Sequence, residues 1–156
     1  MRISRHQLFM EIAHVVAKRS TCPRLNVGSV VVWDNRVVSI GYNGAPAGKP
    51  HCTEIGCKMQ HGHCVSTIHA EVNAIAHVPI EISKLPGKSI YITNAPCSKC
   101  AQVIMNNGTI ARVFFGGAYQ DTSPLGDLIN RGIYVYRVLP SGWLVDHETN
   151  EVVDAE

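Results

Sequence analysis

The chain has 156 residues, of which 46% are hydrophobic and 17% charged, and its formal net charge at pH 7 is +2. These values are typical of one globular domain with a hydrophobic core, and they exclude disordered, collagen-like and low-complexity chains. The small net charge does not indicate a nucleic-acid or membrane partner. The longest apolar run, residues 27–33, is far shorter than the roughly 20 residues of a membrane helix. We expect one domain over residues 1–156, and a cytoplasmic protein because no apolar signal segment begins the chain.

The first predicted elements are a helix and a β-hairpin. Residues 4–7 have the form of a capping box, and apolar residues follow at helical spacing through residues 5–18. Two runs rich in β-branched residues, 27–33 and 36–42, flank the turn residues 34–35. The pattern predicts a helix followed by two antiparallel strands.

The second half of the chain alternates between predicted helices and strands. Residues 43–66 carry Gly, Pro, His and Cys with little periodicity, and an irregular loop of this length is usually functional. Further helices are expected at residues 68–77, 96–107 and 125–131, and further strands at 89–94, 112–116 and 133–138. Residues 143–154 are expected to add an edge strand or to pack on a neighbour. This order predicts an α/β fold, a three-layer αβα sandwich with a mixed central sheet.

Two motifs at predicted helix starts carry the chemistry. Cys97 and Cys100 are three positions apart, so both thiols lie on one face of a first turn, where the helix dipole stabilises thiolate. With His69 as a third ligand, one tetrahedral position stays open, as in a catalytic zinc site. Glu71 can lie beside that position and transfer protons. A lone His-x-Glu is usually a solvated helix turn and a lone Cys-x-x-Cys a redox or structural pair, but together they are the signature of zinc-dependent nucleobase deaminases.

The chain resembles the deoxycytidylate (dCMP) deaminases of the cytidine deaminase superfamily, bacterial and phage types included, over about residues 4–138. The blocks that carry the resemblance are Thr-Cys-Pro-Arg at 21–24, Val-Gly at 27–28, Gly-Tyr-Asn-Gly at 41–44, His-Ala-Glu-Val-Asn-Ala-Ile at 69–75 and Pro-Cys-Ser-Lys-Cys at 96–100. The last block is shared across the superfamily, whereas those at 41–44 and 69–75 are more specific to the nucleotide enzymes. The resemblance implies a cytidine deaminase-like fold and zinc-dependent hydrolysis of dCMP to dUMP and ammonia, a step that feeds thymidylate synthesis. It also implies that water activated at zinc attacks C4 of the cytosine while Glu71 transfers the protons.

The resemblance further implies substrate and effector contacts. Asn43 is expected to hold the sugar, and Arg24 and Tyr119 the phosphate, to which a guanidinium fork is suited. The alternative is that Arg24 is a surface charge and Asn43 an ordinary turn residue. The segment associated in this family with allosteric control by dCTP (activation) and dTTP (inhibition), with Mg²⁺, comprises Gly41, Tyr42, Asn43 and Gly44. Backbone N–H groups freed by its glycines are expected to cradle phosphates, and a homo-oligomer, with a hexamer favoured, is expected.

The remaining cysteines favour a second, structural zinc ion. Six cysteines in a chain without a secretory signal favour metal binding over disulfides. The positions of Cys22 and Cys52 bind such an ion in some phage and bacterial relatives. The preferred ligand set is Cys22, Cys52, Cys57 and His63, with Cys64 as the substitute for the fourth ligand. The alternative is a set of free thiols in a Cys-rich loop, and the other loop histidines His51, His61 and His77 are expected to be ordinary ones.

Competing functions come from two classes. A tRNA adenosine deaminase shares the zinc motif, but its RNA backbone partner favours a basic surface, and both the net charge of +2 and the Gly-Tyr-Asn-Gly block argue against it. Free cytidine deaminases usually have Cys at the position of His69. A non-catalytic zinc-binding module has no use for a carboxylate at Glu71. The expected partners are therefore a nucleotide substrate and nucleotide effectors, with no nucleic acid and no membrane.

Overall fold

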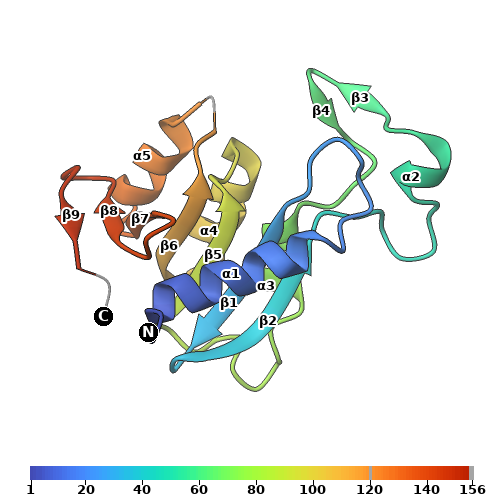
Figure 1. Cartoon of the computed structure of the whole chain (residues 1–156). Helices are drawn as coiled ribbons and strands as arrows, with labels where there is room; N and C mark the ends of the chain where they lie inside the picture. The colour runs from blue at the N-terminus through green and yellow to red at the C-terminus, as the bar shows by residue number, and fades with distance from the viewer. Residues whose placement is uncertain (120, 155–156) are drawn as a thin grey trace.

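The computed structural model describes residues 1–119 and 121–154, which form a mixed sheet with helices on both faces (Figure 1). Within these residues the main sheet has seven strands in the order β2-β1-β5-β6-β7-β8-β9. The strands are β1 (Gly28–Trp33), β2 (Arg36–Tyr42), β5 (Lys88–Asn94), β6 (Ile110–Gly117), β7 (Tyr134–Val138), β8 (Leu144–Asp146) and β9 (Val152–Val153). β5, β6 and β7 run parallel, whereas the other neighbours are antiparallel. The predicted three-layer α/β sandwich on a mixed sheet is confirmed.

The helices divide between the two faces of the sheet. One face is covered by α1 (Arg5–Ala17), and the other by α3 (Ala70–Ala76), α4 (Ser98–Asn107) and α5 (Ser123–Asn130). Ser4 begins α1 as its N-cap, because its hydroxyl accepts a 3.0 Å hydrogen bond from the backbone N–H of Gln7. Gly108 ends α4 in the left-handed conformation, with φ of 75°.

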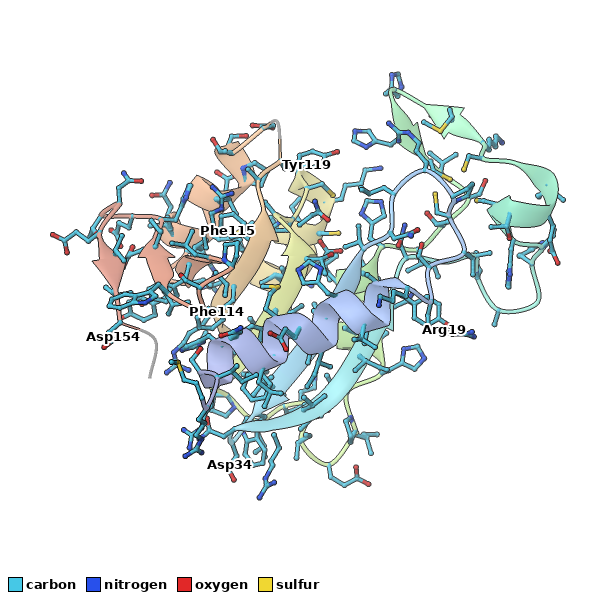
Figure 2. The ribbon with its side chains drawn as sticks, in the orientation of Figure 1. Arg19, Asp34, Phe114, Phe115, Tyr119 and Asp154 are labelled. Carbon is cyan, nitrogen blue, oxygen red and sulfur yellow. The ribbon has the colours of Figure 1, made fainter. Side chains whose placement is uncertain are left out.

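A hydrophobic core lies on each face of the sheet, and β6 contributes to both. Phe114 belongs to the core under α1 and Phe115 to the core under α4 and α5, because successive strand residues point to opposite faces (Figure 2). Phe114 stacks on Tyr91 with ring centroids 4.5 Å apart. The Nδ1 of His6 lies 2.8 Å from the Tyr91 hydroxyl, and its ring centroid lies 4.7 Å from that of Phe114. These contacts fix the start of α1 on the sheet.

The hairpin of β1 and β2 is confirmed as predicted. Asp34 and Asn35 have φ of 49° and 56°, the left-handed values that two-residue hairpin turns require. Gly28, the first residue of β1, lies directly against α1. A Cβ at this position would be 2.0 Å from the carbonyl oxygen of Ala13, so glycine is needed for this close approach.

Residues 45–66, here called the cysteine lobe, project from the body at the upper right of Figure 1. They contain α2 (Cys52–Ile55) and the hairpin of β3 (Met59–Gln60) and β4 (His63–Cys64). The prediction of an irregular loop was wrong for these elements. Elements of four and two residues are too short to leave a periodic pattern in the sequence.

Two boundaries differ from the prediction for physical reasons. α3 begins at Ala70 instead of directly after Thr67, because Ile68 pairs with Gly44 in an antiparallel bridge and the next residue is extended. At the other end of the chain, residues 143–154 add β8 and β9 to the sheet, so the expected edge strand is confirmed. Within the described part of the chain, no helix combines the length and apolar character needed to cross a bilayer.

Candidate active site

His69, Cys97 and Cys100 meet where two helices begin. His69 is the N-cap residue of α3, Cys97 is the N-cap residue of α4, and Cys100 lies in the first turn of α4. The Nδ1 of His69 lies 3.5 Å from the Sγ of Cys97 and 3.2 Å from the Sγ of Cys100. Neither N-cap side chain caps its own helix, because the ring and the thiol face each other. The two helix starts thus bring the three predicted ligand atoms together.

The spacing of these three atoms fits a tetrahedral zinc ion. All three lie within 4.8 Å of one another. With Zn–S of about 2.3 Å and Zn–N of about 2.0 Å, tetrahedral coordination holds a sulfur and a nitrogen about 3.5 Å apart. Three protein ligands leave one coordination position for water or substrate, which is the composition of a catalytic zinc site.

The electrostatics of the trio favour the ligating form of Cys97. The hydrogen bond with Cys100 holds the pKa of the Cys97 thiol at about 3, far below its ordinary value, and the bond to His69 also lowers it. The same contact with Cys97 raises the pKa of His69. These contacts therefore favour the thiolate form of Cys97, and thiolate is the form that binds metal.

Glu71 lies beside this trio in the first turn of α3. Its side chain is 4% exposed, and burial raises the pKa of its carboxyl above the ordinary value. The thiol of Cys100 is one of its neighbours. A carboxyl with a raised pKa, next to an open coordination position, is suited to accept and return protons during a reaction.

Comparison with known proteins decides the family. Residues 3–117 match the family described as "Cytidine and deoxycytidylate deaminase zinc-binding region". The chain belongs to this deaminase family. ComE operon protein 2 of Bacillus subtilis is 40% identical to it over 151 residues, which cover 96% of this chain and 79% of that protein. The deoxycytidylate deaminase of Enterobacteria phage T2 is 30% identical, over 86% of this chain and 92% of the phage protein.

A solved structure supports the same relationship. The dCMP deaminase of the cyanophage S-TIM5, crystallised in complex with dCMP and dUMP, superposes with a TM-score of 0.72 at 27% identity. The superposition covers 84% of this chain and 94% of the phage chain. The cytidine deaminase-like fold predicted from the sequence is therefore confirmed.

In this deaminase, the buried amide of Asn43 clamps the segment that precedes β1. Its Oδ1 accepts a hydrogen bond from the N–H of Val27 at 2.8 Å, and its Nδ2 donates to the carbonyl of Leu25 at 2.7 Å. The backbone carbonyl of Asn43 accepts from the N–H of Thr21 at 3.2 Å and from the hydroxyl of Ser20 at 2.9 Å. Asn43 therefore has a structural task in addition to the sugar contact expected of it, for which one N–H and one lone pair of the amide remain.

The Gly-Tyr-Asn-Gly segment does not offer the free N–H groups that we expected. The N–H of Asn43 donates to the carbonyl of Val27 at 3.2 Å, and the N–H of Gly44 donates to the carbonyl of Ile68 at 3.1 Å. Gly41 lies within the β1–β2 ladder. The N–H groups of Asn43 and Gly44 are therefore already paired and are not available to cradle a phosphate.

The two residues expected at the phosphate lie on different segments. Arg24 is exposed in the segment between α1 and β1. Tyr119 follows β6 and lies on the side of the body that faces the cysteine lobe (Figure 2). Its hydroxyl is 3.4 Å from the Nδ1 of His63 in that lobe.

A second group of four ligand atoms forms at the base of the cysteine lobe. The Sγ of Cys22 lies 3.7 Å from that of Cys57, and the Sγ of Cys52 lies 3.6 Å from that of Cys64. All four sulfurs lie within 4.8 Å of one another. Four sulfurs bound to one tetrahedral zinc ion are about 3.8 Å apart. The donor set and its spacing therefore fit a structural zinc ion.

This group corrects the preferred fourth ligand. The structure brings Cys64 to the other three sulfurs, and His63 instead contacts Tyr119. The reason is that both residues belong to β4, where neighbouring side chains point to opposite sides. Had the strand been recognised in the sequence, this alternation would have excluded one of the two.

Sequence reasoning also missed two residues near the site. His63 was predicted to be a metal ligand, whereas in the structure it contacts Tyr119. Asn73 belongs to the His-Ala-Glu-Val-Asn-Ala-Ile block, but the sequence analysis predicted no contact for its side chain. The Asn73 side chain donates a 2.9 Å hydrogen bond to the carbonyl of Tyr42. The presence of Asn73 in a helix rich in alanine could have indicated this bond, because a half-buried amide needs a hydrogen-bond partner.

Proposed function

We propose that this protein is a zinc-dependent dCMP deaminase that converts dCMP and water to dUMP and ammonia, and so supplies dUMP for thymidylate synthesis. The observation that carries the proposal is the buried carboxyl of Glu71 beside the trio of His69, Cys97 and Cys100. A purely structural metal site would have no use for this carboxyl. The deaminases of phages T2 and S-TIM5 support the choice of substrate.

The residues of the site divide the chemistry between them. His69, Cys97 and Cys100 would hold zinc, which when bound supplies a water that is activated near neutral pH. Glu71 accepts a proton as that water attacks C4 of the cytosine, and it delivers the proton to N3. Glu71 then takes the second proton of the attacking water from the new hydroxyl on C4 and passes it to the amino group, which leaves as ammonia when the C4–N bond breaks. Burial excludes bulk water and raises the pKa of the Glu71 carboxyl, so that it can both accept and donate a proton near neutral pH.

The nucleotide recognition is part of the same proposal. Asn43 contacts the sugar with the part of its amide that the fold does not use, and Arg24 and Tyr119 bind the 5′-phosphate. His63 is close enough to Tyr119 to belong to this end of the site. Charge-assisted hydrogen bonds to a phosphate are strong, so the phosphate should be needed for efficient turnover.

Regulation and assembly complete the proposal. We infer, from the family resemblance, activation by dCTP and inhibition by dTTP with Mg²⁺, and a homo-oligomer with a hexamer favoured. An effector at Gly41–Gly44 must use groups other than the paired N–H groups of Asn43 and Gly44. The six free cysteines are in keeping with a cytoplasmic enzyme. We also propose a second zinc ion, held by Cys22, Cys52, Cys57 and Cys64.

The test is ammonia release by the zinc-loaded protein from dCMP, compared with dCTP, deoxycytidine, cytidine and adenosine. The expected result is turnover of dCMP well above that of the other four. Lys99→Gln, an exposed change in the same helix turn as Cys100, serves as the matched control for variants of the site. Preferential release from adenosine, or no release from any of the five compounds, would overturn the proposal.

A further inference from the structure

The helix that carries Glu71 is short and lacks an ordinary N-cap. α3 has 7 residues, and the side chain of its N-cap residue His69 makes no capping bond. The ring of His69 faces Cys97 and Cys100 instead. A side-chain cap usually stabilises a helix start, so the placement of this helix must depend on other contacts.

The end of β2 provides those contacts. A Cβ at Gly41 would lie 2.3 Å from the carbonyl oxygen of Ala70 and 2.4 Å from the nitrogen of Ala74, so the helix backbone rests directly on the strand. The hydroxyl of Ser39 donates to the carbonyl of Ala74 at 2.5 Å. These contacts set the distance between α3 and the sheet.

Asn73 adds a side-chain hydrogen bond from this helix to the last residue of β2. Its side-chain Nδ2 donates to the carbonyl of Tyr42 at 2.9 Å, and its backbone N–H donates to the carbonyl of His69 at 3.1 Å. A carbonyl only accepts, so the NH₂ end of the amide must face Tyr42. Asn73 therefore links Tyr42, at the end of β2, to His69, whose ring faces Cys97 and Cys100.

The position of Asn73 relative to Glu71 gives this contact a consequence for catalysis. Residues advance about 100° per position around a helix, because one turn takes about 3.6 residues. Asn73 and Glu71 therefore point to nearly opposite sides of α3, and any rotation of the helix that breaks the bond to Tyr42 also moves the carboxyl. A displacement of about 1 Å at a reacting group can cost about 10²-fold in rate.

We propose that Asn73 is a positioning residue for Glu71: its hydrogen bond to Tyr42 fixes the rotation of α3 and so aims the carboxyl at the reacting base. The inference rests on the proposed function, since it concerns the same reaction. It separates two tasks in the site: the proposed phosphate contacts lie on other segments, and Asn43, which adjoins Tyr42, is held by its own bonds to Val27 and Leu25. Loss of the bond should therefore lower kcat and leave substrate binding almost unchanged.

The experiment compares Asn73→Ala with Asn73→Gln, which keeps a carboxamide donor, in zinc-loaded protein. We expect Asn73→Ala to lower kcat for dCMP by about tenfold to a hundredfold, with KM, dUMP affinity and zinc content within about twofold of the unaltered protein. Asn73→Gln should recover most of the lost kcat. Asn107→Ala is the matched control, because the amide of Asn107 bonds Thr109 at the opposite end of α4 from Cys97.

Several outcomes would overturn the inference. One is a kcat for Asn73→Ala within twofold of the unaltered protein, and another is a loss of kcat that follows a loss of zinc or of dUMP binding. If Asn73→Ala does not fold, Asn73→Asp, which keeps the shape and removes the donor, is compared with Asn73→Gln, and equal kcat values contradict the inference. Failure of the proposed function is distinct, because the unaltered protein and Asn107→Ala would then both lack activity on dCMP.

Discussion

The sulfur of Cys22 lies 3.7 Å from the sulfur of Cys57, although the two residues are 35 positions apart in the chain. This contact joins the segment that precedes β1 to the cysteine lobe. Arg24, whose side chain is exposed, follows Cys22 by two residues in the same segment. The carbonyl of the next residue, Leu25, accepts a hydrogen bond from the side-chain amide of Asn43. The backbone at Arg24 is thus held on both sides, which is in keeping with the proposed contact of its side chain with the phosphate.

This arrangement predicts how Arg24 contributes to substrate choice. Arg24→Gln should lower kcat/KM for dCMP by about tenfold to a hundredfold, because hydrogen bonds to a charged group contribute about 1.5–3 kcal/mol. Activity on deoxycytidine, which has no phosphate, should hardly change. Steady-state kinetics on both compounds measures the effect, with Arg19→Gln as an exposed control nearby (Figure 2). An equal loss on the two compounds would show that Arg24 does not read the phosphate.

A second prediction concerns the catalytic carboxyl. Glu71→Gln should retain zinc and fold but lose at least about 10²–10⁴-fold in kcat, because the amide cannot accept or return a proton. Burial raises the pKa of Glu71, so Gln, which is neutral, should be accommodated there without loss of thermal stability. Metal analysis, thermal melting and an ammonia assay are needed together. Near-normal turnover of dCMP by this variant would remove Glu71 from the mechanism.

A third prediction concerns the pH dependence of stability at the start of α1. Burial lowers the pKa of His6 below its ordinary value of 6.5, and the positive charge of Arg112 lowers it further. The unfolded chain therefore takes up this proton at a higher pH than the folded chain does. The contribution of neutral His6 to stability is present above about pH 6.5 and is lost as the pH falls through the lowered pKa of the folded state.

The measurement for His6 is the free energy of urea unfolding between pH 5 and pH 7.5. The difference between the unaltered protein and His6→Gln should shrink toward the acidic end. His14→Gln, an exposed histidine replacement on the same helix, is measured alongside as the matched control. A difference that grows on acidification would mean that His6 is more easily protonated in the folded protein.

The regular elements were predictable wherever their signals are local. The strand over residues 36–42 was found with its observed bounds, because its run of β-branched residues and the turn before it lie within a few residues of one another. The ligand group of His69, Cys97 and Cys100 was predictable for a similar reason, since a Cys-x-x-Cys at a helix start and a His-x-Glu are each local patterns. The αβα order then followed from connection rules.

The remaining features depend on partners that are distant in the chain. The amide of Asn43 bonds a segment 16 to 18 positions earlier, and Asn73 bonds a carbonyl 31 positions earlier. No spacing rule relates such pairs before the fold is known. The paired N–H groups of the Gly-Tyr-Asn-Gly segment were missed in the same way, because composition alone does not reveal which backbone groups a sheet and its neighbours will use.

The last prediction concerns the four sulfurs at the base of the cysteine lobe. Metal-replete protein should contain about two zinc ions per chain, one in each ligand group. Cys64→Ser should remove about one of them and leave part of the deaminase activity, whereas His63→Gln, a change of the neighbouring residue in the same two-residue strand, should retain both.

The short elements of the lobe cannot bury enough apolar surface to order it, and Ile55, Met59 and Val65 are exposed. The binding energy of the metal therefore supplies the folding energy of the lobe. Cys64→Ser should therefore make residues 45–66 more sensitive to protease, and it should raise KM more than it lowers kcat, because the segment of Arg24 loses its anchor at Cys22. A content of about one zinc ion per chain in metal-replete, unaltered protein would leave these cysteines as plain thiols, while the assignment of His69, Cys97 and Cys100 would be unaffected.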